Sequence, residues 1–420
     1  MIETMQLLEG VTLRCVRDHR FKQAALSIQF VRPMLRNEAS LNALLPAVLL
    51  RGSQSYPDIR AITNRLDELY GASVGNIVRR VGDYQTTGFY CGFMEDRFAL
   101  DGEQILKPMM ELACELLRQP LLEDGVFRRD FVEGEKKNLI AVIDAERNDK
   151  RAYANSQMIR IMCREDSFSI PRLGDRESVA AITPEALYDY YHRVLLESPV
   201  EIFYVGSAPA QTVAEVVKPL FEGLERRVMT LPPQTAYHAV ESGSHTQTMD
   251  VAQGKLCMGF TTPVTLRDQE FVAMQLLNLI FGAGMTSKLF MQVREKLSLC
   301  YDIGSGYHGA KGILTVSAGI DCQRKEQVIR EIEAQLEACR TGDITAAELE
   351  AAKQAMYSSI RGIHDSPGGI EGFYATAALS GMNLTPEQYR AGVEQTTVEQ
   401  VAAVARDVKL HTVYFLKGVQ

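Results

Sequence analysis

Two kinds of hydrophobic pattern alternate along the chain. Short apolar runs bounded by glycine, proline or charged residues are typical of strands, whereas apolar residues recurring every three or four positions predict amphipathic helices. The predicted strands are 11–16, 24–31, 73–80, 86–93, 200–205, 255–260, 313–320 and 412–416. The predicted helices are 41–50, 59–70, 102–117, 125–148, 271–281, 327–339, 345–361 and 398–408, with a further helix that begins after Thr183. This mixture predicts an α+β fold.

The order of these elements occurs twice. Leu26 and Leu256, in matching predicted strands, are 230 residues apart. Three later pairs follow with slowly falling separations, as loop deletions would produce: Phe93 and Ile320 (227), Thr183 and Thr397 (214), Val205 and Leu416 (211). We therefore predict two homologous α+β domains, 1–222 and 245–420. The segment 223–244, which contains Pro232, Pro233 and Gly243, is predicted to be the linker.

Composition and charge narrow the class of protein. The chain has 420 residues, 46% of them apolar, and a formal net charge of −8, so a general attraction to nucleic acid or to an anionic membrane is not expected. No window of 18 apolar residues predicts a membrane span, and Met1–Met5 resembles no secretion signal. The eight cysteines form no C-x-x-C motif. We expect a cytoplasmic protein whose cysteines are reduced.

Local motifs supply no complete catalytic set. Gly304–Gly309 matches G-x-G-x-x-G, but it lies between a predicted helix and a predicted strand, so it is interpreted as a connecting turn. The seven histidines form neither H-E-x-x-H nor H-x-x-E-H, and no G-x-S-x-G or Walker A sequence occurs. An enzyme of another chemistry that uses Asp144, Glu146 or Tyr301 stays open as an alternative, although no convergent set supports it.

The stretch from Gly282 to Tyr301 is the most distinctive part of the chain. Gly282 and Gly284 predict a tight turn, and Thr286 and Ser287 are candidate N-caps for the helix that follows. Within that helix the apolar positions predict one buried face; they are Leu289, Phe290, Val293 and Leu297.

Arg294 and Tyr301 end this stretch. They are seven residues apart and could point to one side if the helix unwinds between them. A guanidinium and a phenol so placed would form a pair of donors suited to a carbonyl or a carboxylate. The structural alternative is that Arg294 pairs with a nearby acid and Tyr301 caps the core.

The repeat and its motifs resemble the M16 (insulinase/pitrilysin, mitochondrial processing peptidase-like) family. The most specific segments are Gly-Ala-Gly-Met-Thr-Ser-Lys-Leu-Phe at 282–290 and Val-Arg-Glu-Lys-Leu-Ser-Leu-Cys-Tyr at 293–301. Supporting segments are 66–72, 131–143 with Glu135 and Lys136, 182–185 and 203–206. The resemblance covers nearly the whole chain. It implies a clamshell of two homologous α+β domains of the LuxS/metallohydrolase type.

In active members of that family, H-x-x-E-H and a downstream glutamate hold zinc. Leu49–Ser53 resembles the turn that follows this motif, and counting back places Ala43, Pro46 and Ala47 at its three positions. Val142 falls where the glutamate ligand is expected. Alanine and valine cannot bind zinc and proline cannot accept a proton, so the resemblance implies a degenerate zinc site without cofactor. Arg294 and Tyr301 match the family's substrate-binding pair.

The family also contains heterodimers of a zinc-bearing subunit and an inactive one, and some small bacterial members form such pairs. The leading hypothesis is an inactive subunit that pairs with a zinc-bearing M16 chain and lends Arg294 and Tyr301 to peptide substrates. Zinc is then expected only in the partner. A stand-alone peptide-binding or scaffold protein is the alternative, and a homodimer of the isolated chain stays open.

Overall fold

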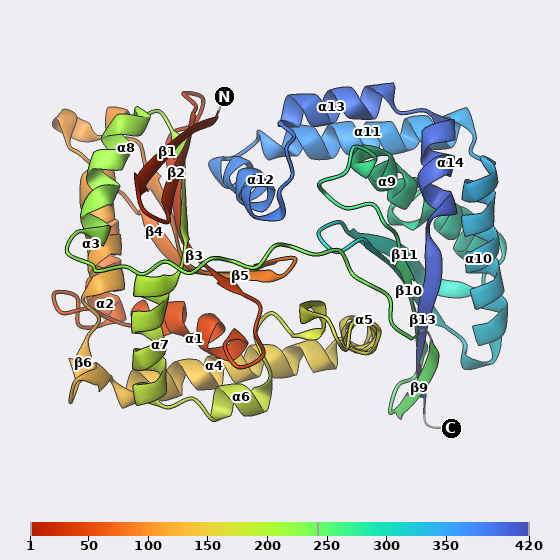
Figure 1. Ribbon diagram of the computed structural model, residues 1–420, viewed down its shortest axis with the longest axis horizontal. Coiled ribbons are helices and arrows are strands. Elements are labelled where there is room, and N and C mark those ends of the chain that lie inside the picture. Colours follow the sequence, from red (N-terminus) through yellow and green to blue (C-terminus); the bar gives the residue numbers. More distant parts are fainter. Residues whose placement is uncertain (1, 242, 419–420) are drawn as a thin grey trace. The chain divides into compact units, whose positions relative to one another are not determined.

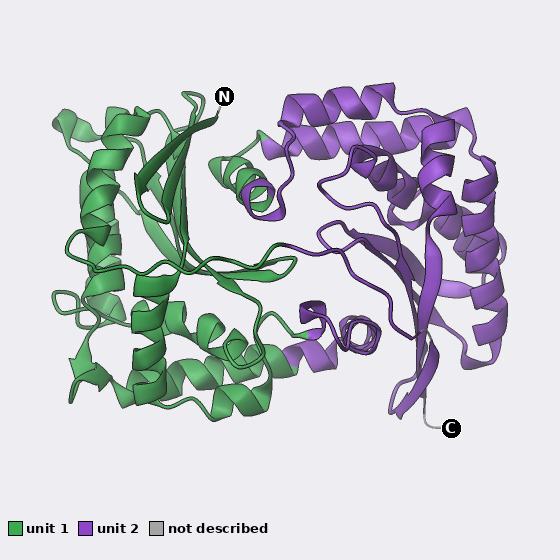
Figure 2. Cartoon of the chain, viewed as in Figure 1, with its two compact units in different colours: residues 1–144, 170–233, 364–376 green, residues 145–169, 234–363, 377–420 purple. Residues whose placement is uncertain are grey.

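The computed structural model describes residues 2–241 and 243–418, which form two compact units (Figure 2). Unit 1 comprises 1–144, 170–233 and 364–376, and unit 2 comprises 145–169, 234–363 and 377–420. The units therefore do not follow chain order. The continuous boundaries 1–222 and 245–420 remain a prediction about the repeat, whereas the compact units are defined by contacts.

Unit 1 is built on a six-stranded sheet in the order β1-β2-β8-β3-β5-β4 (Figure 1). These strands are β1 (Ile2–Leu8), β2 (Val11–Arg17), β3 (Gln23–Pro33), β4 (Ser73–Val81), β5 (Tyr84–Met94) and β8 (Val200–Gly206). β6 (Leu122–Glu123) and β7 (Val126–Phe127) form a separate hairpin. Its helices include α1 (Ala39–Leu49), α2 (Ile59–Glu68), α3 (Leu106–Arg118), α6 (Arg176–Ala180), α7 (Pro184–Glu197) and α8 (Ala210–Val217), together with α4 (Arg129–Asn148) up to Asp144.

Unit 2 is built on a five-stranded sheet in the order β11-β12-β10-β13-β9. The strands are β9 (Gly243–Met249), β10 (Gly254–Thr261), β11 (Cys300–His308), β12 (Ile313–Ile320) and β13 (Lys409–Gly418). Its helices include α5 (Lys150–Met162), α9 (Phe271–Asn278), α10 (Lys325–Thr341), α11 (Ala346–Ile363), α13 (Pro386–Gln395) and α14 (Val398–Arg406). Two π-helical segments, η5 (Leu279–Ala283) and η6 (Leu289–Lys296), lie between α9 and β11.

The two sheets have the same topology. In each, a parallel pair (β2 with β8, β9 with β13) is followed by antiparallel pairs (β8-β3-β5-β4, β13-β10-β12-β11). The match extends to the loops, because Thr183 caps α7 directly before β8 and Thr397 caps α14 directly before β13. β1 is the additional strand of unit 1. The α+β fold and its repeated arrangement are thus confirmed.

Each half of the chain contributes one helix to the unit built mainly from the other half. α5 packs on β10 and β13 of unit 2, and most of α12 (Pro367–Ser380) belongs to unit 1. Leu26 and Ile28 of β3 belong to the core beneath α1, α3 and α7, whereas Ser27 and Gln29 hydrogen-bond to Glu371 of α12. Because strand side chains alternate, the two sets lie on opposite faces, and Figure 1 shows α12 across the sheet from α3.

One prediction about local structure was wrong. Gly304–His308 is not a turn, because these residues lie within β11 and pair with β12. Strand β9 begins at Gly243, inside the predicted linker, whereas residues 224–241 contain no helix or strand. Pairing with β13 makes a strand of a polar segment that has no apolar run of its own. In the described residues, no helix is both long enough and apolar enough to cross a membrane.

Candidate functional site

Pro46 lies inside α1, where it has no N–H to give to the carbonyl four residues earlier. That carbonyl, on Asn42, instead accepts a hydrogen bond of 2.9 Å from the hydroxyl of Thr87 on β5. The hydroxyl satisfies a buried acceptor, so the helix continues through the proline. The predicted buried helix is therefore present and includes Pro46.

The four positions expected to correspond to a zinc site contain no metal-binding atom. Ala43 and Pro46 are buried in α1, Ala47 is half-buried, and Val142 is 52% exposed on α4. Across residues 2–241 and 243–418, no group of three or more histidine, cysteine or acidic side chains is placed to hold a metal ion. The residues present do not fit zinc, and no hydrolytic step can be assigned to them.

The turn after α1 keeps its polar contacts. Arg51 donates to Glu135 of α4 at 3.3 Å, and a side chain at Gly52 would collide with the carbonyl of Pro57. Glu135 and Val142 are two helical turns apart, so they share one side of α4. The turn is therefore joined to α4 by an ion pair, and the positions expected for zinc ligands carry no metal-binding side chain.

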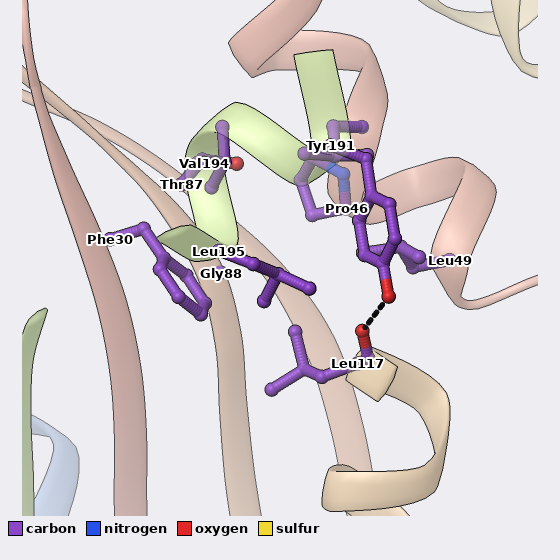
Figure 3. A pocket seen from close by; sticks show the side chains of 10 residues that line it. Phe30, Pro46, Leu49, Thr87, Gly88, Leu117, Tyr191, Val194 and Leu195 are labelled. Carbon is purple, nitrogen blue, oxygen red and sulfur yellow. Dashed lines mark hydrogen bonds between the residues drawn. The ribbon is translucent and has the colours of Figure 1, made fainter. Parts of the chain in front are cut away.

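A small cavity lies beside Pro46 (Figure 3). It is lined mainly by apolar side chains, including Phe30, Leu49 and Leu195, and the hydroxyl of Tyr191 is bonded to the carbonyl of Leu117 at 2.9 Å. Its volume of about 10 Å³ is at the lower limit for one water molecule. It is a packing void in the core and cannot hold a peptide.

A larger, polar pocket of about 470 Å³ lies in unit 2 at the end of η6. It is lined by Arg294, Glu295, Ser298, Leu299, Cys300, Tyr301, Asp321 and Arg324. The helix does unwind between Arg294 and Tyr301, since η6 ends at Lys296 and β11 begins at Cys300. The structure thus brings both predicted residues to one cavity.

Arg294 is held loosely. Its guanidinium lies over the ring of Phe290, 4.6 Å from the centroid, and its Nε is 3.6 Å from Glu295. Both members of this pair are 40–50% exposed, so the contact with Glu295 stabilises little. The predicted pairing with a nearby acid is present, yet it leaves the guanidinium accessible from the pocket.

Tyr301 does not cap the core, because it is 72% exposed. Cys300 pairs with Ile320 and Asp302 pairs with Gly319, which leaves Tyr301 as an extra residue without a partner in β12. Such a bulge re-aims the side chain at that position. Asp302, the residue that follows the bulge, forms an ion pair with Arg151 of α5 at 3.1 Å. The phenol is thus presented to the pocket by an irregularity of the strand.

The helix around Arg294 differs in part from its prediction. Leu289 and Val293 are fully buried as expected, but Leu297 is 41% exposed and lies beyond the end of η6. Ser287 accepts from the amide of Phe290 at 3.3 Å, so one of the two predicted caps is used. The exposed apolar residues of this stretch are Met285, Met291, Leu297 and Tyr301.

Arg324 was missed by the sequence reasoning. It precedes α10 and donates to the carbonyl of Ser298 at 3.0 Å, and it lines the same pocket as Arg294. No local motif marks this residue. Asp144 and Glu146, considered as alternatives, are not part of this pocket, and Asp144 is paired with Arg176.

Burial affects the Cys300 thiol in the pocket. It raises the pKa of the Cys300 thiol to about 11, with nearby Asp302 acting in the same direction. The thiol is therefore protonated at neutral pH and is a poor nucleophile. The hydrogen-bond donors that line the pocket are the guanidinium groups of Arg294 and Arg324 and the phenol of Tyr301, beside the carboxylates of Glu295 and Asp321.

Comparison with known proteins agrees with these observations. Residues 181–356 match the family model described as "Peptidase M16 inactive domain". The "Probable inactive metalloprotease YmfF" of Bacillus subtilis is 30% identical over 411 residues, which cover 98% of this chain and 96% of that protein.

Solved structures resemble the whole chain. A conserved protein from Enterococcus faecalis V583 superposes with a TM-score of 0.91 at 28% identity, covering 100% of this chain and 99% of that one. A structure described as a peptidase M16 inactive domain from Pseudomonas fluorescens gives a TM-score of 0.82 at 18% identity, covering 100% and 98%, which shows a shared fold. The chain belongs to the M16 peptidase family, and the positions expected for its zinc ligands contain no metal-binding side chain.

Proposed function

We propose that this chain is the non-catalytic subunit of a two-chain M16 peptidase, in which it binds the substrate peptide while a zinc-bearing M16 chain performs hydrolysis. One observation carries the proposal. The positions expected for zinc ligands carry no metal-binding side chain, yet Arg294 and Tyr301 line one accessible polar pocket. A chain that neither cleaves nor binds peptides would need no accessible guanidinium and phenol at this place.

The two side chains suit a peptide backbone. A phenol and a guanidinium can both donate to a carbonyl oxygen, and the guanidinium can also bind a carboxylate. When water attacks a peptide bond, the carbonyl oxygen gains negative charge, and donors aimed at it stabilise the transition state. Arg294 and Tyr301 would supply such donors to a peptide whose zinc and general base lie on the partner.

The sheet offers a way to hold the peptide. β11 is an edge strand of the unit 2 sheet, and Tyr301 is its second residue. An extended peptide that pairs with a sheet edge gains backbone hydrogen bonds and places alternate side chains in pockets. A peptide added along β11 would begin beside the pocket, and the stretch before β11 carries the exposed apolar side chains of Met291 and Leu297.

The test is reconstitution with an M16 chain that contains H-x-x-E-H, taken first from a neighbouring gene. The two chains are co-expressed, and peptide hydrolysis is measured for each alone and for the mixture, with and without a chelator. We expect a stable complex and chelator-sensitive cleavage only in the mixture. If no complex forms but this chain alone binds peptides, it is a stand-alone peptide-binding or scaffold protein, and the proposal fails.

A further inference from the structure

The turn that joins Arg294 to Tyr301 has an unusual backbone. Ser298 has a φ of +49°, a left-handed conformation that is unfavourable for a residue other than glycine. The amide of Ser298 donates to the carbonyl of Arg294 at 3.1 Å, and the amide of Leu299 donates to the carbonyl of Val293 at 3.0 Å. Such a conformation persists only where surrounding contacts determine it.

Arg324 supplies a contact from outside the turn. Its Nη1 donates to the Ser298 carbonyl at 3.0 Å, and this is the hydrogen bond that its side chain makes among the described residues. Ser298 lies two residues beyond the end of η6, and positive charge is favourable near the C-terminus of a helix. Arg324 therefore stabilises the end of η6 and the turn together.

The backbone at Arg324 is itself held in place by hydrogen bonds. Its amide donates to the carbonyl of Asp321 at 3.0 Å, and the Asp321 side chain accepts from the amide of Gln323 at 2.9 Å. Directly after it, α10 is anchored in the core by Val328 and Ile332, both fully buried. A guanidinium attached to so rigid a backbone can hold the turn in one place.

We propose that Arg324 is a positioning residue, which fixes the turn at Ser298 and thereby the relative placement of Arg294 and Tyr301 in the peptide-binding pocket. This inference rests on the proposed function. Ser298 lies four residues after Arg294 and three before Tyr301. A shift of this turn would move both donors relative to each other, and a misplacement of about 1 Å can cost on the order of 10²-fold in rate.

The first test does not depend on any partner. Hydrogen exchange of the full chain is followed by mass spectrometry in peptides that cover 297–301. We expect Arg324→Ala to speed exchange of the Ser298 and Leu299 amides by about tenfold, because a charge-assisted hydrogen bond is lost. Arg324→Lys should recover part of the protection, since an ammonium can still donate to a carbonyl. Arg330→Ala, which changes an exposed arginine on α10, is the matched control and should change nothing. Unchanged exchange in Arg324→Ala would overturn the inference.

The second test uses the reconstituted two-chain peptidase. Arg324→Ala should lower kcat/KM by roughly 10–100-fold, with partial recovery in Arg324→Lys. In the Tyr301→Phe background, Arg324→Ala should lower kcat/KM little further, because a misplaced phenol and a missing hydroxyl remove the same interaction. If Tyr301→Phe slows cleavage and Arg324→Ala does not, the inference is wrong. If Tyr301→Phe itself has no effect, the proposed function fails, and hydrogen exchange alone then decides whether Arg324 holds the turn.

Discussion

Arg79 of β4 holds the carboxylate of Glu371 on α12 through two parallel hydrogen bonds of 2.8 and 2.9 Å. Glu371 is fully buried, and Ser27 and Gln29 donate to the same carboxylate. In unit 2 the corresponding edge strand, β11, is tied to α5 by Asp302 and Arg151. Each helix exchanged between the halves of the chain is thus attached to its sheet by an ion pair on the edge strand.

Substituting Arg79 by methionine should destabilise the protein by roughly 3 kcal/mol, because Glu371 would remain as a buried carboxylate without its cation. Glu371→Gln in the same background should recover part of the loss, since a neutral amide is less costly to bury. Urea unfolding followed by circular dichroism measures both, with the exposed Arg60→Met on α2 as control. Equal stability of Arg79→Met and the parent would show that the pair does not hold α12.

The contact that accommodates Pro46 can be tested by a double-mutant cycle. Thr87→Val removes the donor to the Asn42 carbonyl without changing side-chain shape, and should cost about 1–2 kcal/mol. In a Pro46→Ala background the new backbone N–H can satisfy that carbonyl, so the same change should cost clearly less. The two costs are compared by chemical unfolding. Equal costs in both backgrounds would contradict this account.

His411 on β13 should make stability depend on pH. The ring is buried, which lowers its pKa from 6.5, with Nδ1 2.7 Å from the Thr412 hydroxyl and Nε2 3.4 Å from that of Tyr237. Between the folded pKa and 6.5 the unfolded chain binds more protons, so the free energy of unfolding should fall as pH drops through this window. His411→Asn should flatten this slope, whereas the exposed His238→Asn should leave it unchanged. The same slope in both variants would exclude His411 as the cause of this pH dependence.

The purified chain should contain no stoichiometric zinc, because Ala43, Ala47 and Val142 offer no donor. Elemental analysis after dialysis against a weak chelator provides the measurement. Zinc held tightly at one per chain, and retained after substitution of the exposed His238 and His245, would require a site that the described residues do not contain.

Tyr301→Phe should lower the rate of the reconstituted two-chain peptidase by on the order of 10²–10³, because a donor to the developing oxyanion is lost. Folding and pairing should be unaffected, since the side chain is largely exposed and only its hydroxyl is removed. Arg294→Ala should also weaken substrate binding, because a charge-assisted contact is lost. Rates are measured per mole of intact complex, with Tm recorded alongside. Near-full activity of both variants would show that the pair is structural.

The elements with strong local patterns could be predicted from the sequence. β12 has the predicted bounds, and Pro184–Glu197 follows the predicted cap at Thr183. α5 and α12 were not predicted as helices of their own, because their partners lie on sheets from the other half of the chain. β11 was partly mistaken for a turn, since pairing with β12 outweighs the low strand preference of Gly304 and Gly306.

Sequence by itself determined the repeat, the family resemblance, the absence of donors at the positions expected for zinc ligands and the candidates Arg294 and Tyr301, because these depend on residue identity and spacing. Only the tertiary structure decided that the two candidates line one pocket, that Tyr301 is exposed on a bulge and that Arg324 holds the turn between them. A bulge depends on the register with a neighbouring strand, and the contact between Arg324 and Ser298 joins residues 26 positions apart. Neither leaves a periodic signal along the chain, because both arise when separate elements pack together.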